Sequence, residues 1–499
     1  MDKKVWKRLL AVLLSAALLI GAMPVALAAE AGEDGQWTWE QTDNSTVTAA
    51  LSRQSVAEKE EEPPYAEGET VRVSIVLEDK PTLLRFPKAA DGDIASNTAA
   101  KTYRSKLEAQ QDAMANTISR EVLQGKKLDV VWNLTLAANI ISANVEYGKL
   151  EEIKALEGVK DVFVETQYEP MVASVGGDDP NMQVSSDMTG TTQAWNNKYK
   201  GQGMRVAIID TGLKTEHQSM NAAAFDHALE EDATADGKTV ADYKLLNQAE
   251  IQSKLTQLNA YKRDGAKVTA AQLYRTTKIP YGYAYVDKDL DITHDNDTQG
   301  DHGSHVAGIA TANRYLKKAD GTFASAMDEV HMTGDAPDAQ VLVMKVFGNN
   351  GGAYDSDYMV AIEDAVVLGC DTINLSLGSG NPGTAAYGND EYQKILDSFV
   401  KYQSLVVISA GNSGTWAESS EVGALYSDDA SFDMVGSPGS YTNAFTVASV
   451  DNNGMIGMGF TYGSGTLVIP TDTVGNFSAL DVSADKSGTA LDYVYLDKI

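Results

Sequence analysis

The sequence predicts an α/β protein, in which a doubly wound parallel sheet is preceded by a small ferredoxin-like α+β unit. Continuously apolar segments alternate with helical stretches between residues 205 and 450, a pattern typical of parallel strands that are buried on both faces. Ahead of them, residues 71–166 follow the order β-α-β-β-α-β of a ferredoxin-like unit. The 499-residue length has room for about two to four domains.

Residues 1–28 have the features of a signal peptide. A basic start precedes an uncharged apolar run, and Ala26-Leu27-Ala28 supplies the small residues that a signal peptidase requires. An uncleaved membrane anchor is the alternative, because about 20 apolar residues can span a bilayer. Pro24 and the small residues favour cleavage after Ala28, and no later segment is apolar enough to cross a membrane.

Composition speaks against one class of function and limits the covalent cross-links. The formal net charge of -30 opposes nucleic-acid binding, which requires a basic surface. Cys370 is the only cysteine, so no intramolecular disulfide can form. Because Cys370 lies between a helical pattern and an apolar strand, we expect a buried structural thiol rather than a nucleophile.

The N-terminal part divides by composition into a leader, a compact unit and a linker. Residues 29–69 are polar and acidic, which indicates a flexible leader. The compact unit covers residues 70–168. Its first strand is expected at 71–77, its long helix at 102–123 and its last strand at 161–166. Residues 169–190, which include GGDDPN, are expected to form an exposed linker.

The parallel sheet is expected within residues 191–451. Its strands are the apolar segments RVAIID (205–210), QVLVMKVF (340–347), TINLSL (372–377), LVVISA (405–410) and AFTVASV (444–450). A helix-rich polar insertion, at about 219–279, separates the first two strands. In residues 452–499 short strands with Gly, Thr and Ser turns replace the helical patterns, which indicates the start of a separate β-rich domain.

Polar residues follow several of these strands at their carboxyl ends, where functional groups collect in open α/β sheets. Asp210 ends the first strand, and Asn412 follows the fourth. His302 would begin a helix whose small residues allow close approach to the sheet, and the helix dipole there disfavours an imidazolium. A nearby carboxylate would offset that effect and fix the ring tautomer, as the acid of a Ser-His-Asp triad does. Asp210 is available for this.

Three segments in this order, AIIDTGL, HGSHVAGI and SAGNSG, resemble the Asp, His and oxyanion-hole blocks of the subtilisin-like serine proteases. The resemblance covers residues 185–450. It implies that Asp210 orients His302, that His302 is the general base, and that Asn412 donates to the oxyanion. It also implies two backbone edges that clasp an extended polypeptide substrate as an added strand. These edges are Gly351, Gly352 and Ala353, and Ser376, Leu377 and Gly378.

The resemblance also gives roles to the flanking parts. Residues 70–168 resemble the inhibitory propeptide of this family, which assists folding, occupies the cleft and is cut away; an independent binding module is the alternative. The helical insertion and the segment after residue 452 resemble cell-envelope members of the lactocepin and C5a-peptidase type. In those proteins a protease-associated domain separates the oxyanion block from the serine block. A secreted or cell-envelope location of the Gram-positive type is therefore expected.

Metal ions offer a second interpretation of two segments. His302 and His305 could form a zinc pair, but neither a Glu beside the first His nor a third ligand is evident, so we expect no metal there and His305 on the packed side of the helix. The acidic loop 287–297 lacks the glycine and closing Glu of a calcium loop, so we expect a solvated loop. The resemblance implies no required cofactor, although calcium is common in the family, at a site that the sequence does not locate.

The serine block of the family, of the type G-T-S-M-A, is not found in the 499 residues. The nearest strings, Gly465-Thr466-Leu467 and Gly488-Thr489-Ala490, have another residue where the serine belongs. Two interpretations follow: a fragment of an exported serine endopeptidase precursor, inert alone, or a natural pseudoprotease that binds peptides or acts at the cell surface. The intact Asp210, His302 and Asn412 favour the fragment, because a binding protein has no chemical need for them.

Overall fold

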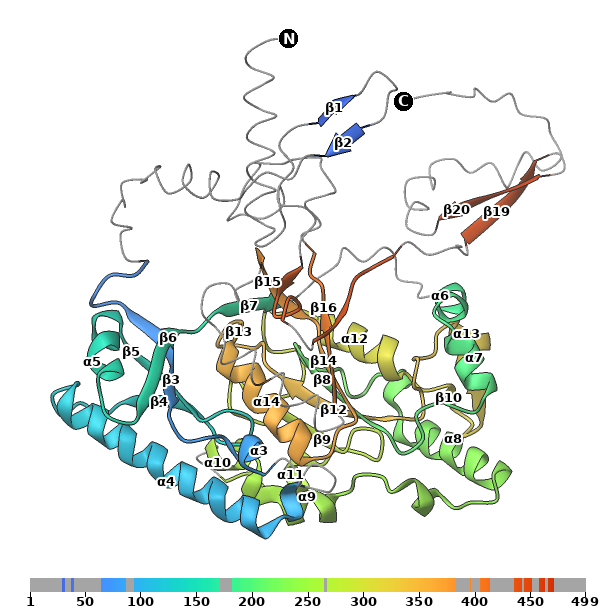
Figure 1. Cartoon of the computed structure of the whole chain (residues 1–499). Helices are drawn as coiled ribbons and strands as arrows, with labels where there is room; N and C mark the ends of the chain where they lie inside the picture. The colour runs from blue at the N-terminus through green and yellow to red at the C-terminus, as the bar shows by residue number, and fades with distance from the viewer. Residues whose placement is uncertain are drawn as a thin grey trace. The chain divides into compact units, whose positions relative to one another are not determined.

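The computed structural model (Figure 1) describes residues 64–86, 94–170, 182–263, 267–382, 395, 404–412, 435–441 and 444–450, and four further strands at 29–31, 37–39, 457–462 and 465–470. The chain divides into two compact units, Met1–Ala66 and Glu67–Ile499. In the first unit β1 (Ala29–Ala31) pairs antiparallel with β2 (Trp37–Trp39), where the sequence predicts a flexible leader; the two tryptophans favour extended backbone. The predicted signal peptide lies outside the described residues. Within the described part of the chain, no helix is both long and apolar enough to span a membrane.

The second unit begins with a four-stranded antiparallel sheet in the order β4-β5-β3-β6. Its elements are β3 (Thr70–Leu77), α3 (Thr82–Arg85), η2 (Ile94–Ser96), α4 (Thr98–Glu121), β4 (Asp129–Leu134), β5 (Ile140–Glu146), η3 (Tyr147–Lys149), α5 (Leu150–Lys154) and β6 (Val159–Val164). The predicted β-α-β-β-α-β order is confirmed. Helix α4 begins before the predicted residue 102 because Asn97 caps it, accepting a 3.0 Å hydrogen bond from the Ala100 amide.

A six-stranded sheet follows, with every neighbouring pair parallel and the order β18-β16-β14-β8-β12-β9. Its strands are β8 (Arg205–Asp210), β9 (Tyr281–Ala284), β12 (Gln340–Lys345), β14 (Thr372–Leu375), β16 (Leu405–Ser409) and β18 (Phe445–Val447). The five predicted strands are all present. Strand β9 was not predicted, because Tyr-Gly-Tyr-Ala is short, contains a glycine and has no aliphatic run.

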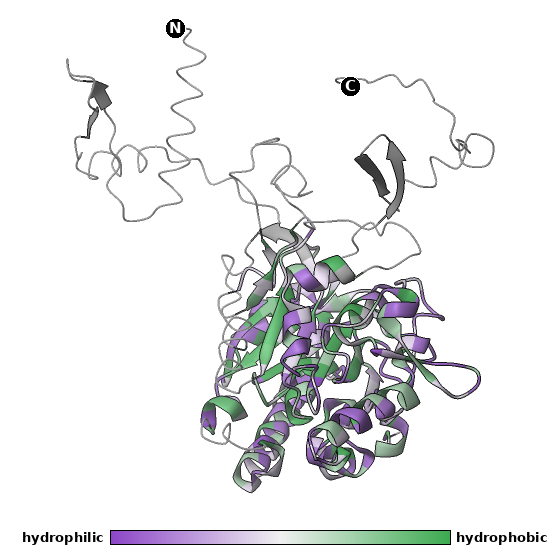
Figure 2. Cartoon of the chain, turned by 90° about the vertical axis from the view of Figure 1, so that its right-hand side faces the viewer, coloured by the Kyte–Doolittle hydropathy of each residue, from purple (hydrophilic) through white to green (hydrophobic). Residues whose placement is uncertain are grey.

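Helices cover both faces of this sheet, as a doubly wound fold requires. Ile209 of β8 belongs to the apolar cluster that contains most of α14 (Asp355–Val367), whereas Ile208 clusters with Ala307 of α12 (His302–Thr311). Successive residues of a strand point to opposite faces, so α14 and α12 lie on opposite sides of the sheet. Figure 2 shows hydrophobic residues gathered on the central strands and hydrophilic residues along the surrounding helices.

Helix α14 is buried along its whole length, because the four-stranded sheet packs on the side that faces away from the parallel sheet. The Trp132 indole donates to Asp357 (2.7 Å), and the amides of Leu136 and Ala137 both donate to Glu363 (2.8 Å each). The N-terminal sheet and the parallel sheet therefore share one interior around α14, as Figure 1 shows.

Shorter elements complete the described structure. The helix-rich insertion between β8 and β9 contains η4 (Gln218–Met220), α8 (Ala222–Ala235), η5 (Val240–Tyr243), α9 (Gln248–Lys254), η6 (Leu255–Gln257), α10 (Asn259–Arg263) and α11 (Ala270–Leu273). The others are β7 (Gln167–Pro170), α6 (Gln183–Met188), α7 (Thr191–Asn196), β10 (Tyr315–Lys317), β11 (Phe323–Ser325), α13 (Ala326–Val330), β13 (Ala353–Tyr354), β15 (Leu377–Pro382), β17 (Gly436–Ser437), and the antiparallel pair β19 (Gly457–Tyr462) and β20 (Gly465–Pro470).

Candidate active site

An aspartate and a histidine meet at the carboxyl end of the central strand. Asp210 is the last residue of β8, and His302 is the first residue of α12. Nδ1 of His302 lies 2.8 Å from Oδ1 of Asp210, and the two side chains are 10% and 1% exposed. An ionised carboxylate can only accept a hydrogen bond, so Nδ1 carries the hydrogen and Nε2, on the other side of the ring, has the lone pair that a base needs.

Glycine at position 303 allows this approach of α12 to β8. A Cβ on Gly303 would lie 2.3 Å from the carbonyl oxygen of Gly212 and 3.1 Å from Cβ of Asp210. The amide of Gly303 donates to Oγ1 of Thr211 at 2.9 Å, which ties the start of the helix to the turn after β8. Asp210 itself is held by the Thr211 amide, which donates to Oδ1 at 2.7 Å. Hydrogen bonds to Thr211 thus hold both the Asp210 side chain and the start of α12.

The other predicted site residues lie at the same edge of the sheet. Asn412 follows β16, and Ser376 lies between β14 and β15, so both are at carboxyl ends of parallel strands, as Asp210 is. Gly351 closes a tight turn with Gly348, through mutual backbone hydrogen bonds of 3.1 and 3.0 Å. This turn and the buried Gly352 lead into β13.

Strand β7 of the N-terminal part lies between the two predicted edges. Ala353 of β13 pairs antiparallel with Tyr168, and Leu377 and Gly378 of β15 pair antiparallel with Pro170 and Glu169. Strand β13 follows β12 and β15 follows β14, while β8 lies between β12 and β14 in the sheet. The strand order therefore places β7 beyond the carboxyl end of β8, where Asp210 is found. Strand β7 also extends beyond residue 168, where the sequence predicts the end of the N-terminal domain.

A buried carboxylate holds the side chain at the centre of β7. Tyr168 is fully buried, and its hydroxyl donates to Oδ1 of Asp355 at 2.9 Å. The Tyr358 hydroxyl donates to the same oxygen at 3.0 Å, and the Thr166 amide donates to Oδ2 at 2.7 Å. Burial, with the Glu165 carboxylate nearby, raises the pKa of Asp355 to about 7. No sequence pattern indicates this contact, because it depends on which residue of α14 faces β7.

The second histidine of the motif is exposed, so the prediction that His305 faces the packed side is wrong. The helix turns Gly303, Ala307 and Gly308 toward the sheet, and His305 lies on the other side of α12. His217 is exposed, as predicted.

The carboxylates of the acidic loop are engaged by the protein itself. Asp287 accepts the amides of Asn349 and Asn350 at 3.0 and 2.9 Å, and Asp297 pairs with the buried ammonium group of Lys345. The side chain of Asp297 is only 3% exposed, so it is not solvated as predicted, because it pairs with the buried Lys345, whereas Asp295 is exposed. Over the described residues, no group of three or more His, Cys, Asp or Glu side chains is arranged to hold a metal ion.

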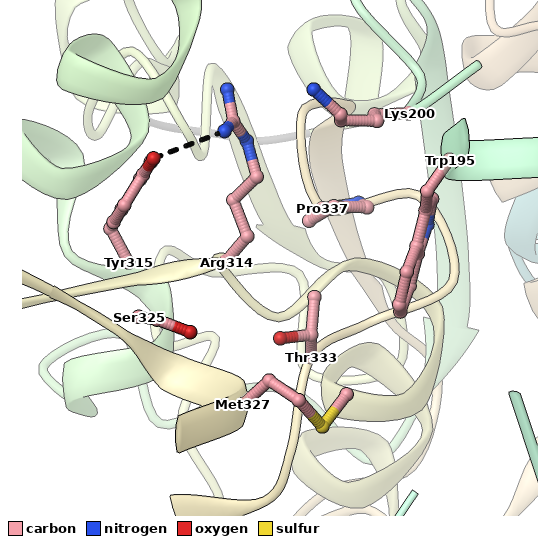
Figure 3. Close-up of a pocket in the computed structure, with 8 residues that line it drawn as sticks. All are labelled: Trp195, Lys200, Arg314, Tyr315, Ser325, Met327, Thr333 and Pro337. Carbon is pink, nitrogen blue, oxygen red and sulfur yellow. Dashed lines mark hydrogen bonds between the residues drawn. The ribbon is translucent and has the colours of Figure 1, made fainter. Parts of the chain in front are cut away.

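Two further features lie outside the candidate site. A cavity of about 200 Å³ is lined by Trp195, Lys200, Arg314, Tyr315, Ser325, Met327, Thr333 and Pro337 (Figure 3). Its cations are already paired, since Arg314 contacts Asp338 and Lys200 contacts Asp232. The Cys370 thiol is buried as predicted, and burial raises its pKa to about 12.

The parallel sheet and the Asp210–His302 pair at its carboxyl edge are the arrangement that the resemblance to the subtilisin-like proteases predicts. The family model of the subtilase family matches residues 201–490. The PI-type proteinase of Lactococcus lactis subsp. cremoris is 30% identical over 77% of this chain and 18% of its own length. The C5a peptidase of Streptococcus pyogenes is 30% identical over 50% of this chain and 18% of its own length. The minor extracellular protease Vpr of Bacillus subtilis is 26% identical over 69% of this chain and 34% of its own length.

The chain belongs to the subtilase family, as the sequence motifs predicted, and is related to the lactococcal PI-type proteinase and to C5a peptidase. It spans 18% of the length of both.

Proposed function

We propose that this chain is the precursor part of an exported serine endopeptidase that hydrolyses extended polypeptides, and that residues 70–170 act as its intramolecular inhibitor. The pairing of β7 with β13 and β15 supports this most strongly. A protease holds its substrate as an extended strand beside the catalytic groups, and β7 is such a strand beyond the end of β8. The buried contacts between the N-terminal sheet and α14 would keep β7 in place.

In this proposal each site residue has one task. His302 takes the proton of the nucleophilic serine and passes it to the leaving amine, while Asp210 holds the ring in the required tautomer and stabilises the imidazolium. Asn412 donates to the oxyanion of the tetrahedral intermediate. The nucleophile is a serine of the family's serine block, which the 499 residues do not contain, so in this proposal no acyl-enzyme forms on these residues alone. None of these steps uses a cofactor, and calcium stays in the proposal only as a stabilising ion without an assigned site.

The second candidate is a peptide-binding or cell-surface pseudoprotease, in which the Asp210–His302 pair and the β7 pairing would serve binding alone. Export is part of both proposals and rests on the signal-peptide pattern of residues 1–28. Export is also supported by the similarity to a protein that is named an extracellular protease.

A fluorophosphonate probe, which labels only an activated serine, distinguishes the two candidates. Residues 29–499 should not react, whereas the complete gene product should be labelled at a serine of a G-T-S block beyond residue 499. The His302→Ala variant of the complete product should lose the label, and His217→Ala, at the exposed histidine, should keep it. Labelling of neither form would favour the pseudoprotease, and His302-dependent labelling of residues 29–499 would show that a serine in this sequence is the nucleophile.

A further inference from the structure

The side chain of Tyr168 is enclosed by residues that follow the strands of the parallel sheet, not by residues of the N-terminal sheet. The residues that interact with it, here called the tyrosine pocket, are Asp355, Tyr358, Ser437 and Tyr441. The rings of Tyr168 and Tyr358 meet edge to face, with centroids 5.4 Å apart and planes at 83°. Tyr358, Leu377 and Tyr441 are all buried in the same apolar cluster as Tyr168.

The polar groups of the pocket form hydrogen bonds with the phenol hydroxyl of Tyr168. The Tyr168 hydroxyl donates to Asp355 and is also paired with the Ser437 side chain. Asp355 is fully buried, and two of its donors, the Tyr168 hydroxyl and the Thr166 amide, belong to the bound segment. A phenylalanine in the pocket would leave the fully buried Asp355 with one donor fewer, and unpaired buried acceptors are costly.

We propose that the tyrosine pocket is a specificity subsite, in which Asp355 selects polypeptides that carry a tyrosine at the position of Tyr168. This rests on the proposed function, in which β7 lies where a substrate lies. The pairing of β7 extends to Pro170. In the proposed function the cleaved bond follows this paired segment. The selected tyrosine would then be at least the third residue on the N-terminal side of the cleaved bond. A site built around a substrate hydroxyl discriminates strongly against the analogue that lacks it. With phenylalanine bound, Asp355 would still accept the hydrogen bond from the Tyr358 hydroxyl, so its loss is partial. We therefore expect a preference for tyrosine over phenylalanine of about 10- to 100-fold in kcat/KM.

The test uses the complete gene product after its N-terminal part has been cleaved away, and two quenched fluorescent peptides. One has the sequence Thr-Gln-Tyr-Glu-Pro-Met-Val-Ala-Ser-Val of residues 166–175, and the other has phenylalanine in place of the tyrosine. The enzyme should prefer the tyrosine peptide, and Asp355→Asn and Asp355→Ala should reduce that preference to within a few-fold. Asp357→Asn is the matched control, because Asp357 lies on the same helix and its partner in the cleaved enzyme is the Tyr354 amide (3.0 Å), outside the tyrosine pocket.

The outcomes separate this inference from the proposed function. Equal cleavage of both peptides by the wild type, or a preference that survives in both Asp355 variants, would overturn the inference and leave the protease proposal standing. A product that neither cleaves nor reacts with fluorophosphonate would overturn the protease proposal. The same two peptides are then measured for binding by fluorescence anisotropy, where equal affinities would overturn the tyrosine pocket as well.

A second measurement needs no mature enzyme and no change in the pocket. In the 499-residue chain, Tyr168→Phe should raise amide hydrogen exchange in β7 by about tenfold, since one hydrogen bond to a buried carboxylate is lost. Tyr103→Phe is the control, because the Tyr103 hydroxyl donates to the Lys80 carbonyl in an exposed position. Unchanged exchange in the Tyr168 variant would count against the subsite.

Discussion

Replacing Gly303 with alanine should separate His302 from Asp210 without removing either. The added Cβ would lie 2.3 Å from the Gly212 carbonyl oxygen and 2.9 Å from the Gly212 nitrogen. Both atoms are backbone, so the start of α12 has to move away by about 1 Å or slightly more to approach an ordinary contact. His302 is the neighbouring residue, and its 2.8 Å bond to Asp210 would lengthen by a similar amount.

A displacement of about 1 Å at a catalytic group can cost about 10²-fold in rate, and the overpacked contact should lower stability by about 1 to 3 kcal/mol. The assay is the rate of fluorophosphonate labelling of the complete gene product, with thermal unfolding measured alongside. Gly308→Ala on the same helix is the control, because its Cβ would meet only the flexible end of Met332 at 3.0 Å. Equal labelling rates for the two variants would refute the idea that the glycine sets the geometry of the pair.

Three further predictions follow from the site and the interior. Asn412→Ala in the complete enzyme should lower kcat by about 10²- to 10³-fold with little change in KM, measured by steady-state kinetics, and an unchanged kcat would show that Asn412 is not the oxyanion donor. Cys370, whose pKa burial raises to about 12, should resist iodoacetamide at pH 8 in the folded chain and react in urea; rapid labelling of the folded chain would contradict its burial. The free energy of unfolding should fall as the pH rises from about 4 to 7, because burial raises the pKa of Asp355 to about 7 and the folded state then binds more protons than the unfolded state. Urea titrations should show a smaller fall for Asp355→Asn, and an identical pH dependence would refute this origin.

The sequence predicted the parallel sheet and the Asp210–His302 pair because both follow from local patterns. An apolar run followed by an acid, and a histidine before small helical residues, need no knowledge of distant contacts. The exposure of His305 could also have been predicted, since Gly303 and Ala307 mark the face of the helix that meets the sheet. The contact of Tyr168 with Asp355 could not, because the two are separated by 187 positions and meet only through the register of β7 with β13. Strand β9 was missed for a different reason, since Tyr-Gly-Tyr-Ala is short and has no aliphatic run, although all four residues are buried.

The central claim is that β7 occupies the groove as a substrate segment and that His302 acts on the peptide bond beyond it. The most direct measurement is the N-terminus of the mature protein, determined by mass spectrometry after expression of the complete gene product. Because β7 pairs as far as Pro170, we predict a mature N-terminus within residues 171–181, produced by the wild type and absent from the His302→Ala variant. A mature N-terminus before residue 167, or the same cleavage in His302→Ala expressed alone, would contradict the account.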